Sequence, residues 1–275
     1  MIRTVTAELL LLRKRPSTWI LLGIWAALAL TFAYAVPYVQ YTNDPSRRSL
    51  TDVLPESLVG TLMAGFPFFG GVLALMLGVL TIGSEYGWGT LKTLFTQGPG
   101  RLHAFGAKLV AIGIALVPFV LVVFALGAAS SYAIALGEGA DVSWPSASLM
   151  LRGLAGGWLV LAVWAALGVM LAVLTRGTAL ATGIGILYAF VIEGLFSALA
   201  NEVSLLDRVV EFFVRANGYS LVAVLGVSPD DVGDRGPGSF SGPFVDGGQA
   251  TLVLLAYTAA FVAVAAWLLR RRDVT

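Results

Sequence analysis

Five long stretches of the sequence contain no charged residue, and their length limits what the chain can fold into. They are residues 16–43, 57–84, 109–137, 153–175 and 247–269, and a sixth stretch, 177–201, is apolar apart from Glu193. Each could carry a helix of about 20 residues across the hydrocarbon core of a bilayer. A soluble domain of 275 residues could not bury this much apolar surface, since 58 % of the residues are hydrophobic and 12 % are charged. The sequence therefore predicts a membrane protein.

The apolar stretches are expected to be helices, because backbone amides in lipid must pair internally and no alternating β-barrel segments are visible. We predict an all-α membrane protein, a single transmembrane domain over residues 1–275 with six transmembrane helices. The spans are placed at about 17–38, 58–82, 107–135, 150–174, 178–199 and 250–269. The first span is expected to be retained, since its apolar run exceeds that of a cleaved signal peptide.

The charges divide unequally between the two sets of loops. The loops on the side of the termini hold 11 of the 17 Lys and Arg residues but only three acids, whereas the opposite set holds 12 of the 16 acids. By the positive-inside rule, both termini are predicted to be cytoplasmic in a multi-pass plasma-membrane protein. The Ala-, Gly- and Val-rich composition indicates a bacterial source.

Three segments lie outside the predicted spans. Residues 1–15 place Ile2, Val5 and Leu9 at helical spacing beside basic residues, which predicts an interfacial helix or, equally, a simple topology signal. The cytoplasmic loop 83–106 can form a short helix over 85–96. The extracellular segment 200–249 is predicted to contain an amphipathic helix over 204–216, with Arg208, Glu211 and Arg215 on one face, and then a loop rich in Gly, Pro and Asp.

The composition and the motifs also exclude most kinds of catalytic and metal-binding site. The chain has no cysteine and a single histidine, His103, so no metal site or cysteine nucleophile is expected. No P-loop motif GxxxxGK[ST] occurs, and the segment 238–242 fails to match GxSxG because its centre is Phe240. We therefore predict a protein that is not itself an enzyme and binds no cofactor.

Glu193 is the one ionisable residue well inside a predicted span. An intramembrane carboxylate costs several kcal/mol unless it is neutralised or paired, which makes it a candidate functional residue. The alternative is a hydrogen-bonded Glu near the outer boundary that faces the helix bundle, and the nearby span end slightly favours this alternative.

The inner loop and the C-terminus together resemble the membrane subunit of type-2 ATP-binding-cassette (ABC) exporters. Those permeases carry a Glu, then Gly-Thr and a basic residue, in the loop between the second and third spans; here this is Glu85-Tyr-Gly-Trp-Gly89-Thr90-Leu-Lys92. A basic residue follows at the base of the third span, here Lys108, and family members often end in basic residues and Asp, here Arg271-Arg272-Asp273. The outer loop 228–249 is longer and richer in glycine than is usual in the family.

The resemblance implies a fold with an N-terminal interfacial helix, a cytoplasmic coupling helix and an extracellular helical segment before the last span. It also implies a partner ABC nucleotide-binding ATPase, which would hold ATP and Mg²⁺, and a second copy of the permease or a homologous permease. Membrane lipid is expected as a partner and nucleic acid is not. The ATPase-docking residues would be Glu85, Trp88, Gly89, Thr90, Leu91, Lys92 and Phe95.

The same resemblance implies that the two paired permeases enclose a translocation path between them. We expect the second and fifth spans to line it, since glycines, aromatic residues and Glu193 lie there, and the candidate lining residues are Glu193, Phe66, Phe68 and Phe69. The expected function is export of a hydrophobic or amphipathic substrate, such as a drug, antibiotic, peptide or lipid. The alternative is a secondary transporter or channel in which Glu193 couples transport to a proton or another ion.

Overall fold

The structure, a computed structural model, describes residues 1–46, 48–87, 100–200, 208–226 and 244–271. These residues contain helices and no strand. In chain order the elements are α1 (Ile2–Lys14), α2 (Pro16–Leu30), η1 (Thr31–Ala35), α3 (Val36–Asn43), η2 (Leu50–Val53), η3 (Pro55–Ser57), α4 (Leu58–Met63), η4 (Phe66–Gly70), α5 (Gly71–Gly87), α7 (Arg101–Glu138), α8 (Ala147–Thr175), α9 (Ala179–Leu187), η5 (Tyr188–Ile192), α10 (Glu193–Ala200), α12 (Val214–Ala223) and α14 (Gly247–Arg271).

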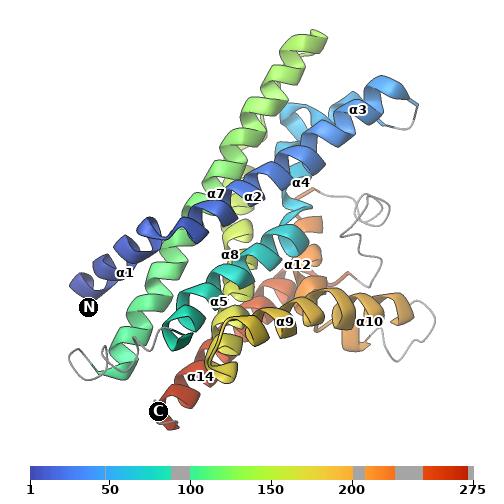
Figure 1. Cartoon of the computed structure of the whole chain (residues 1–275). Coiled ribbons are helices and arrows are strands. Elements are labelled where there is room, and N and C mark those ends of the chain that lie inside the picture. The colour runs from blue at the N-terminus through green and yellow to red at the C-terminus, as the bar shows by residue number, and fades with distance from the viewer. Residues whose placement is uncertain (47, 88–99, 201–207, 227–243, 272–275) are drawn as a thin grey trace.

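Within this described part, six helices are long and apolar enough to cross a membrane. They cover Pro16–Asn43, Phe66–Gly87, Arg101–Glu138, Ala147–Thr175, Ala179–Phe196 and Gly247–Arg271. The prediction of an all-α membrane protein with six membrane-spanning helices is therefore confirmed. Figure 1 shows that the two termini lie at the same end of the bundle, which we call the terminal end; the other is the distal end.

The centre of the bundle is formed by α5 and α8, most of whose residues are buried. The two helices cross at glycines. A Cβ atom added to Gly78 would lie 2.2 Å from the carbonyl oxygen of Ala165, and one added to Gly168 would lie 2.2 Å from that of Leu75. Small residues allow membrane helices to approach this closely, so the glycines fix the distance between α5 and α8.

The start of the second span differs from the prediction. Residues 58–82 were expected to form one helix, but Leu58–Met63 is the separate short helix α4, and the span begins at Phe66. The chain turns at residues 64–65, and the ring of Pro67 then removes one backbone N–H from the helical ladder. The buried helix α4 packs instead against α7 and α8.

The link between α1 and α2 is set by proline. Arg15 precedes Pro16 and has extended backbone angles (φ −76°, ψ 121°), as expected for a residue before proline. The chain therefore turns at Arg15 while helix continues on both sides. Helix α1, which occupies the position predicted for the first short helix, packs against α7 and buries Glu8 and Leu12.

The predicted helix over 204–216 is wrong in its described part. Residues 208–210 are helical, the chain turns at 211–213, and a new helix, α12, begins at Val214. The side-chain amide of Asn217 stabilises the turn by donating to the carbonyls of Glu211 and Phe213, both at 2.8 Å. As a result Arg215 is buried, whereas Arg208 is exposed.

Candidate functional site

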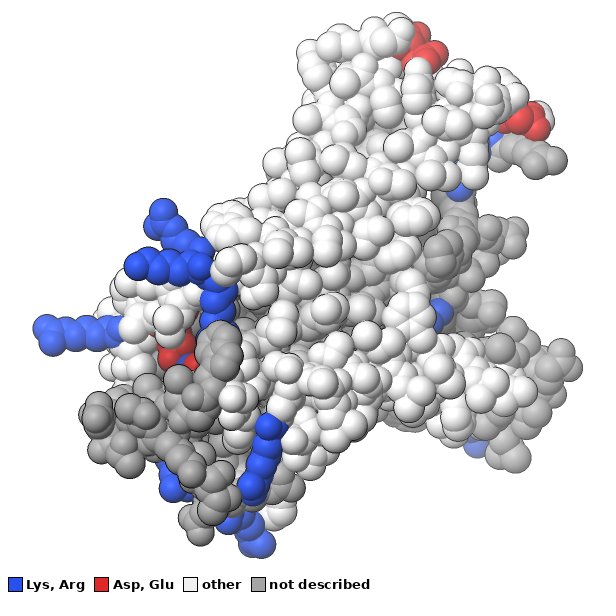
Figure 2. All heavy atoms as spheres, in the orientation of Figure 1, with Lys and Arg blue, Asp and Glu red and all other residues white. Residues whose placement is uncertain are grey.

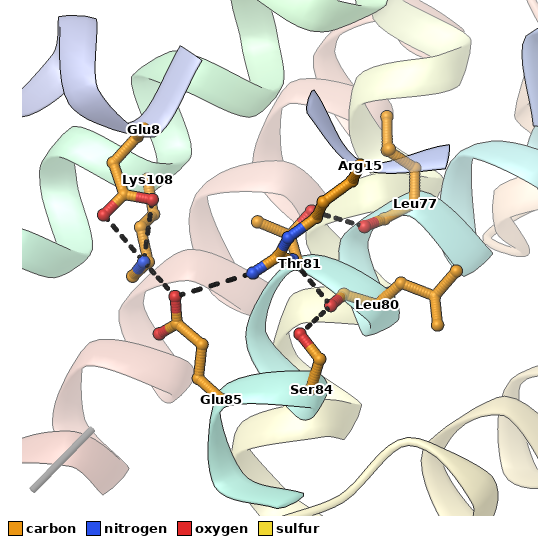
Figure 3. Close-up of polar contacts among 8 residues, drawn as sticks. All are labelled: Glu8, Arg15, Leu77, Leu80, Thr81, Ser84, Glu85 and Lys108. Carbon is orange, nitrogen blue, oxygen red and sulfur yellow. Dashed lines mark hydrogen bonds and ion pairs between the residues drawn. The ribbon is translucent and has the colours of Figure 1, made fainter. Parts of the chain in front are cut away.

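Four ionisable side chains from separate parts of the chain meet at the terminal end. Figure 3 shows Lys108 of α7 between Glu8 of α1 and Glu85 of α5, with Arg15 on the far side of Glu85. The Lys108 Nζ atom lies 2.7 and 2.8 Å from the two carboxylate oxygens of Glu8 and 2.5 Å from Oε1 of Glu85. The Arg15 Nη2 atom lies 4.0 Å from the same oxygen of Glu85. We call these residues the four-charge cluster.

Three members of the four-charge cluster are buried, and Arg15 is half-buried. Lys108, Glu8 and Glu85 are 3 %, 6 % and 7 % exposed. Isolated charges are very costly to remove from water, and burial is tolerated when opposite charges pair with good hydrogen-bond geometry. Two acids and two bases meet this requirement, so the cluster can hold α1, α5 and α7 together.

Arg15 also contacts the backbone of α5. Its Nη1 atom donates to the carbonyl of Leu80 at 3.2 Å, and the hydroxyl of Ser84 donates to the same carbonyl at 2.6 Å. Thr81 donates to the carbonyl of Leu77 at 2.7 Å (Figure 3). Arg15 therefore joins the link before α2 to the last turns of α5, from which Glu85 projects.

Of the residues predicted to dock an ATPase, the structure describes one, Glu85. Glu85 is buried in the four-charge cluster and bound by Lys108. The others, Trp88, Gly89, Thr90, Leu91, Lys92 and Phe95, lie outside the described residues. Sequence reasoning missed Arg15 as a partner of Glu85 and Glu8 as a second partner of Lys108. The available signal was that Glu8 is the sole acid in residues 1–43.

At the surface, Lys and Arg side chains gather at the terminal end, and acidic side chains are visible at the distal end (Figure 2). The acids of the four-charge cluster contribute little to this surface, because Glu8 and Glu85 are buried beside Lys108. Arg13, Lys14 and Arg270, by contrast, are exposed.

Among the candidate path residues, Phe66 belongs to the core. Its side chain is fully buried, with its ring 5.1 Å from that of Trp25 and 6.2 Å from that of Phe124. It fills the space left by Gly157, where an added Cβ would lie 2.7 Å from the ring. In this conformation Phe66 therefore offers no surface to a path.

Phe68 and Phe69 join three spans through a line of aromatic rings. Phe32 stacks on Phe69 at 5.0 Å, Phe69 meets Phe68 at 5.1 Å, and Phe68 meets Phe190 at 4.7 Å. The end members, Phe32 and Phe190, are 38 % and 47 % exposed.

The line of rings coincides with a backbone irregularity. Its members lie on the π-helical segments η1, η4 and η5, one each in the first, second and fifth spans. A π-helical turn is rare and often marks a functional site. The sequence indicated the aromatics but gave no signal for the π-helical turns.

Glu193 is 1 % exposed and begins α10 directly after η5. Its Oε2 atom accepts a hydrogen bond of 3.0 Å from the backbone N–H of Arg215, in the first turn of α12. The carboxylate is thus hydrogen-bonded to another part of the chain and buried in the bundle interior, and a role of Glu193 in transport stays a prediction.

Comparison with known protein families identifies a match that covers more than half of the chain. The profile of a family described as "ABC-2 family transporter protein" matches residues 4–192, which include the first four spans, most of the fifth and all members of the four-charge cluster. No curated protein matches the chain.

Proposed function

The chain belongs to the ABC-2 transporter family and is a membrane permease subunit, and we propose that it works in an ATP-driven exporter. The proposed complex contains two permeases, this chain paired with a second copy or a homologue, and two nucleotide-binding ATPase subunits. ATP and Mg²⁺ would be bound by the ATPase, since the sequence contains no P-loop. The terminal end would face the cytoplasm, in keeping with its exposed basic side chains.

The observation that carries this proposal is the position of Lys108. It binds Glu85 near the end of α5 and Glu8 on α1, and it lies near the start of α7. The two ends of the inner loop and the N-terminal helix are therefore fastened to one another. A force applied to the loop by an ATPase would reach all three helices together, whereas a loose loop would absorb it.

We propose that the docking contact itself is made by the loop residues beyond Gly87. Trp88, Leu91 and Phe95 would supply an apolar face, and Lys92 would supply a charge for an ion pair with the ATPase. Glu85 would act beneath them by holding the loop in place through Lys108.

The proposed substrate is hydrophobic or amphipathic. The exposed rings of Phe32 and Phe190 and the half-buried Phe69 support this choice, because they present aromatic surface where three spans meet. Transport coupled to an ion through Glu193 is less well supported, since the carboxylate is buried and accepts the Arg215 N–H.

Co-purification with an ATPase tests the proposal. The tagged chain would be expressed in its native host, extracted in mild detergent and analysed for a bound protein with P-loop motifs. We expect such an ATPase to co-purify with the natural chain. It should not co-purify with the Lys92→Glu variant. The matched control is Arg270→Glu, which reverses an exposed positive charge at the same end and should retain the ATPase.

Transport is then measured in inside-out vesicles that contain the purified complex. We expect uptake of an amphipathic dye to need ATP and to persist when a protonophore removes the proton gradient. A monodisperse permease that binds no ATPase, or uptake that is abolished by the protonophore alone, would contradict the proposal.

A further inference from the structure

Helix α12 is unusual because it is short, polar in part and almost completely buried. It is not one of the six membrane-spanning helices, yet eight of its ten residues are buried, among them Arg215, Asn217 and Ser220. Buried polar residues are costly unless they are paired. Their partners therefore indicate what holds α12 in place.

Glu193 and Arg215 form a reciprocal contact between the fifth span and α12. The Glu193 carboxylate accepts from the backbone N–H of Arg215 at 3.0 Å, which satisfies an N–H of the first helical turn and places a negative charge at the positive end of the helix. The Arg215 Nη1 atom donates in return to the carbonyl of Ala189 at 3.5 Å. Ala189 lies in η5, one turn before Glu193.

Arg215 also reaches the second span. Its guanidinium carbon lies 5.3 Å from the centre of the Phe68 ring, in η4, and 5.8 Å from that of Tyr219 on α12. Both contacts are within cation–π range. Nearby, α12 packs directly on η4, because a Cβ atom added to Gly218 would lie 3.1 Å from Cβ of Pro67.

A further hydrogen bond joins α12 to the last span. The hydroxyl of Ser220 accepts from the backbone N–H of Val245 at 3.0 Å, just before α14 begins. Helix α12 therefore contacts the second span, the fifth span and the approach to the sixth. Helix α12 is itself too short to be a span, so these contacts join a non-spanning helix to three of the spans.

We infer that Glu193 and Arg215 are positioning residues that clamp α12 onto the second and fifth spans and so close the distal end of the permease. Opening of this end separates the Glu193 carboxylate from the first turn of α12 and lifts the Arg215 guanidinium from Phe68. The step from closure to transport rests on the proposed function, whereas the clamp itself does not.

Cysteine labelling tests the clamp without reference to transport. The natural chain has no cysteine, so Ser220→Cys provides a single thiol at a position that is 0 % exposed. The protein in lipid nanodiscs is treated with a maleimide, and the labelling rate is measured by intact mass. We expect Arg215→Met and Glu193→Leu each to raise the rate about tenfold or more, because the clamp limits local opening. Glu193→Gln, which keeps an acceptor oxygen, should raise it less.

The matched control is Arg208→Met, which removes an exposed arginine outside α12 and should leave the rate unchanged. An unchanged rate in both Arg215→Met and Glu193→Leu would overturn the clamp. If those variants fail to insert into the membrane, a cross-link provides a second test. The pair Pro67→Cys and Gly218→Cys is well placed, because the two Cβ atoms would lie about 3.1 Å apart, close to disulfide range.

The oxidised pair is expected to transport at less than about a tenth of the rate of the reduced pair, since α12 can no longer leave the second span. Each single-cysteine variant treated with the same oxidant serves as a control. Equal transport by the oxidised and reduced pair would overturn the closing role of α12. Absence of ATP-driven transport in the natural chain would instead contradict the proposed function, and the labelling experiment would still decide whether Glu193 and Arg215 hold α12.

Discussion

Lys108 on α7 binds both carboxylate oxygens of Glu8 on α1, at 2.7 and 2.8 Å, although the two residues are 100 positions apart. The pair is buried, so removal of the lysine leaves two carboxylates, Glu8 and Glu85, without their shared cation. We expect Lys108→Met to lower the free energy of unfolding by about 3–5 kcal/mol, the usual cost of breaking a buried ion pair from one side. The measurement is equilibrium unfolding in mixed detergent micelles.

Two further variants make this first prediction specific. Lys14→Met removes an exposed lysine of α1 and should change stability little. Lys108→Met combined with Glu8→Gln and Glu85→Gln removes all three charges and should recover most of the loss. If Lys108→Met alone unfolds like the natural chain, the four-charge cluster does not hold the terminal end together.

The crossing of α5 and α8 gives a second prediction. Gly78→Ala would place a methyl group 2.2 Å from the carbonyl oxygen of Ala165, and backbone cannot yield there without separating the helices. We expect a loss of about 2 kcal/mol or more, as for an overpacked core. Gly183→Ala is the matched control, because an added Cβ at this helical position meets nothing within 4 Å. Equal thermal unfolding of the two variants would show that the close approach is not needed.

Two buried tryptophans allow a test of a single hydrogen bond. Trp25 Nε1 donates to the carbonyl of Phe119 at 3.2 Å, whereas Trp164 Nε1 makes no hydrogen bond within the described part of the chain. Both side chains are 1 % exposed, so replacement by Phe removes the same buried volume at each site. We expect Trp25→Phe to be more destabilising than Trp164→Phe by about 1 kcal/mol, the net contribution of one hydrogen bond. A reversed order in chemical unfolding would contradict this assignment.

Two aromatic residues of the second span are expected to have different roles, one in stability and the other in substrate selectivity. Phe66→Ala removes a fully buried ring from the core and should cost about 3–5 kcal/mol while the ranking of substrates stays the same. Phe69→Ala should cost less, since its ring is only half-buried, and should alter the relative uptake of aromatic and aliphatic amphiphiles. Competition assays in vesicles provide the measurement. A changed substrate ranking in Phe66→Ala alone would reverse the two roles.

The span count could be predicted from sequence because a charge-free stretch of sufficient length has few alternatives in a membrane protein. The start of the second span could not be predicted, since no charged residue interrupts residues 57–84. The helix instead breaks at the turn at 64–65 and at Pro67. The prediction of a single helix over 204–216 was wrong for a related reason. Arg215 fits a polar helix face by spacing alone, but in the structure its guanidinium contacts the Ala189 carbonyl and the Phe68 ring, which lie far away in the sequence.

The candidate site was recovered in part. Glu85 and Lys108 were identified through a family resemblance, and Glu193 through its isolation in an apolar stretch. Their partners are contributed by distant segments, and spacing along the chain contains no information on such contacts. Glu8 and Arg15 were therefore attributed to a surface helix and a topology signal, although both take part in the four-charge cluster.

The contact between Glu8 and Lys108 also orders the assembly of the newly made protein. Glu8 leaves the ribosome 100 residues before its cation, and until then its carboxylate stays hydrated, because burial without a counterion is too costly. Helix α1 can therefore dock only after the third span has been synthesised. Helix α1 thus reaches its final place only after two later spans have been made.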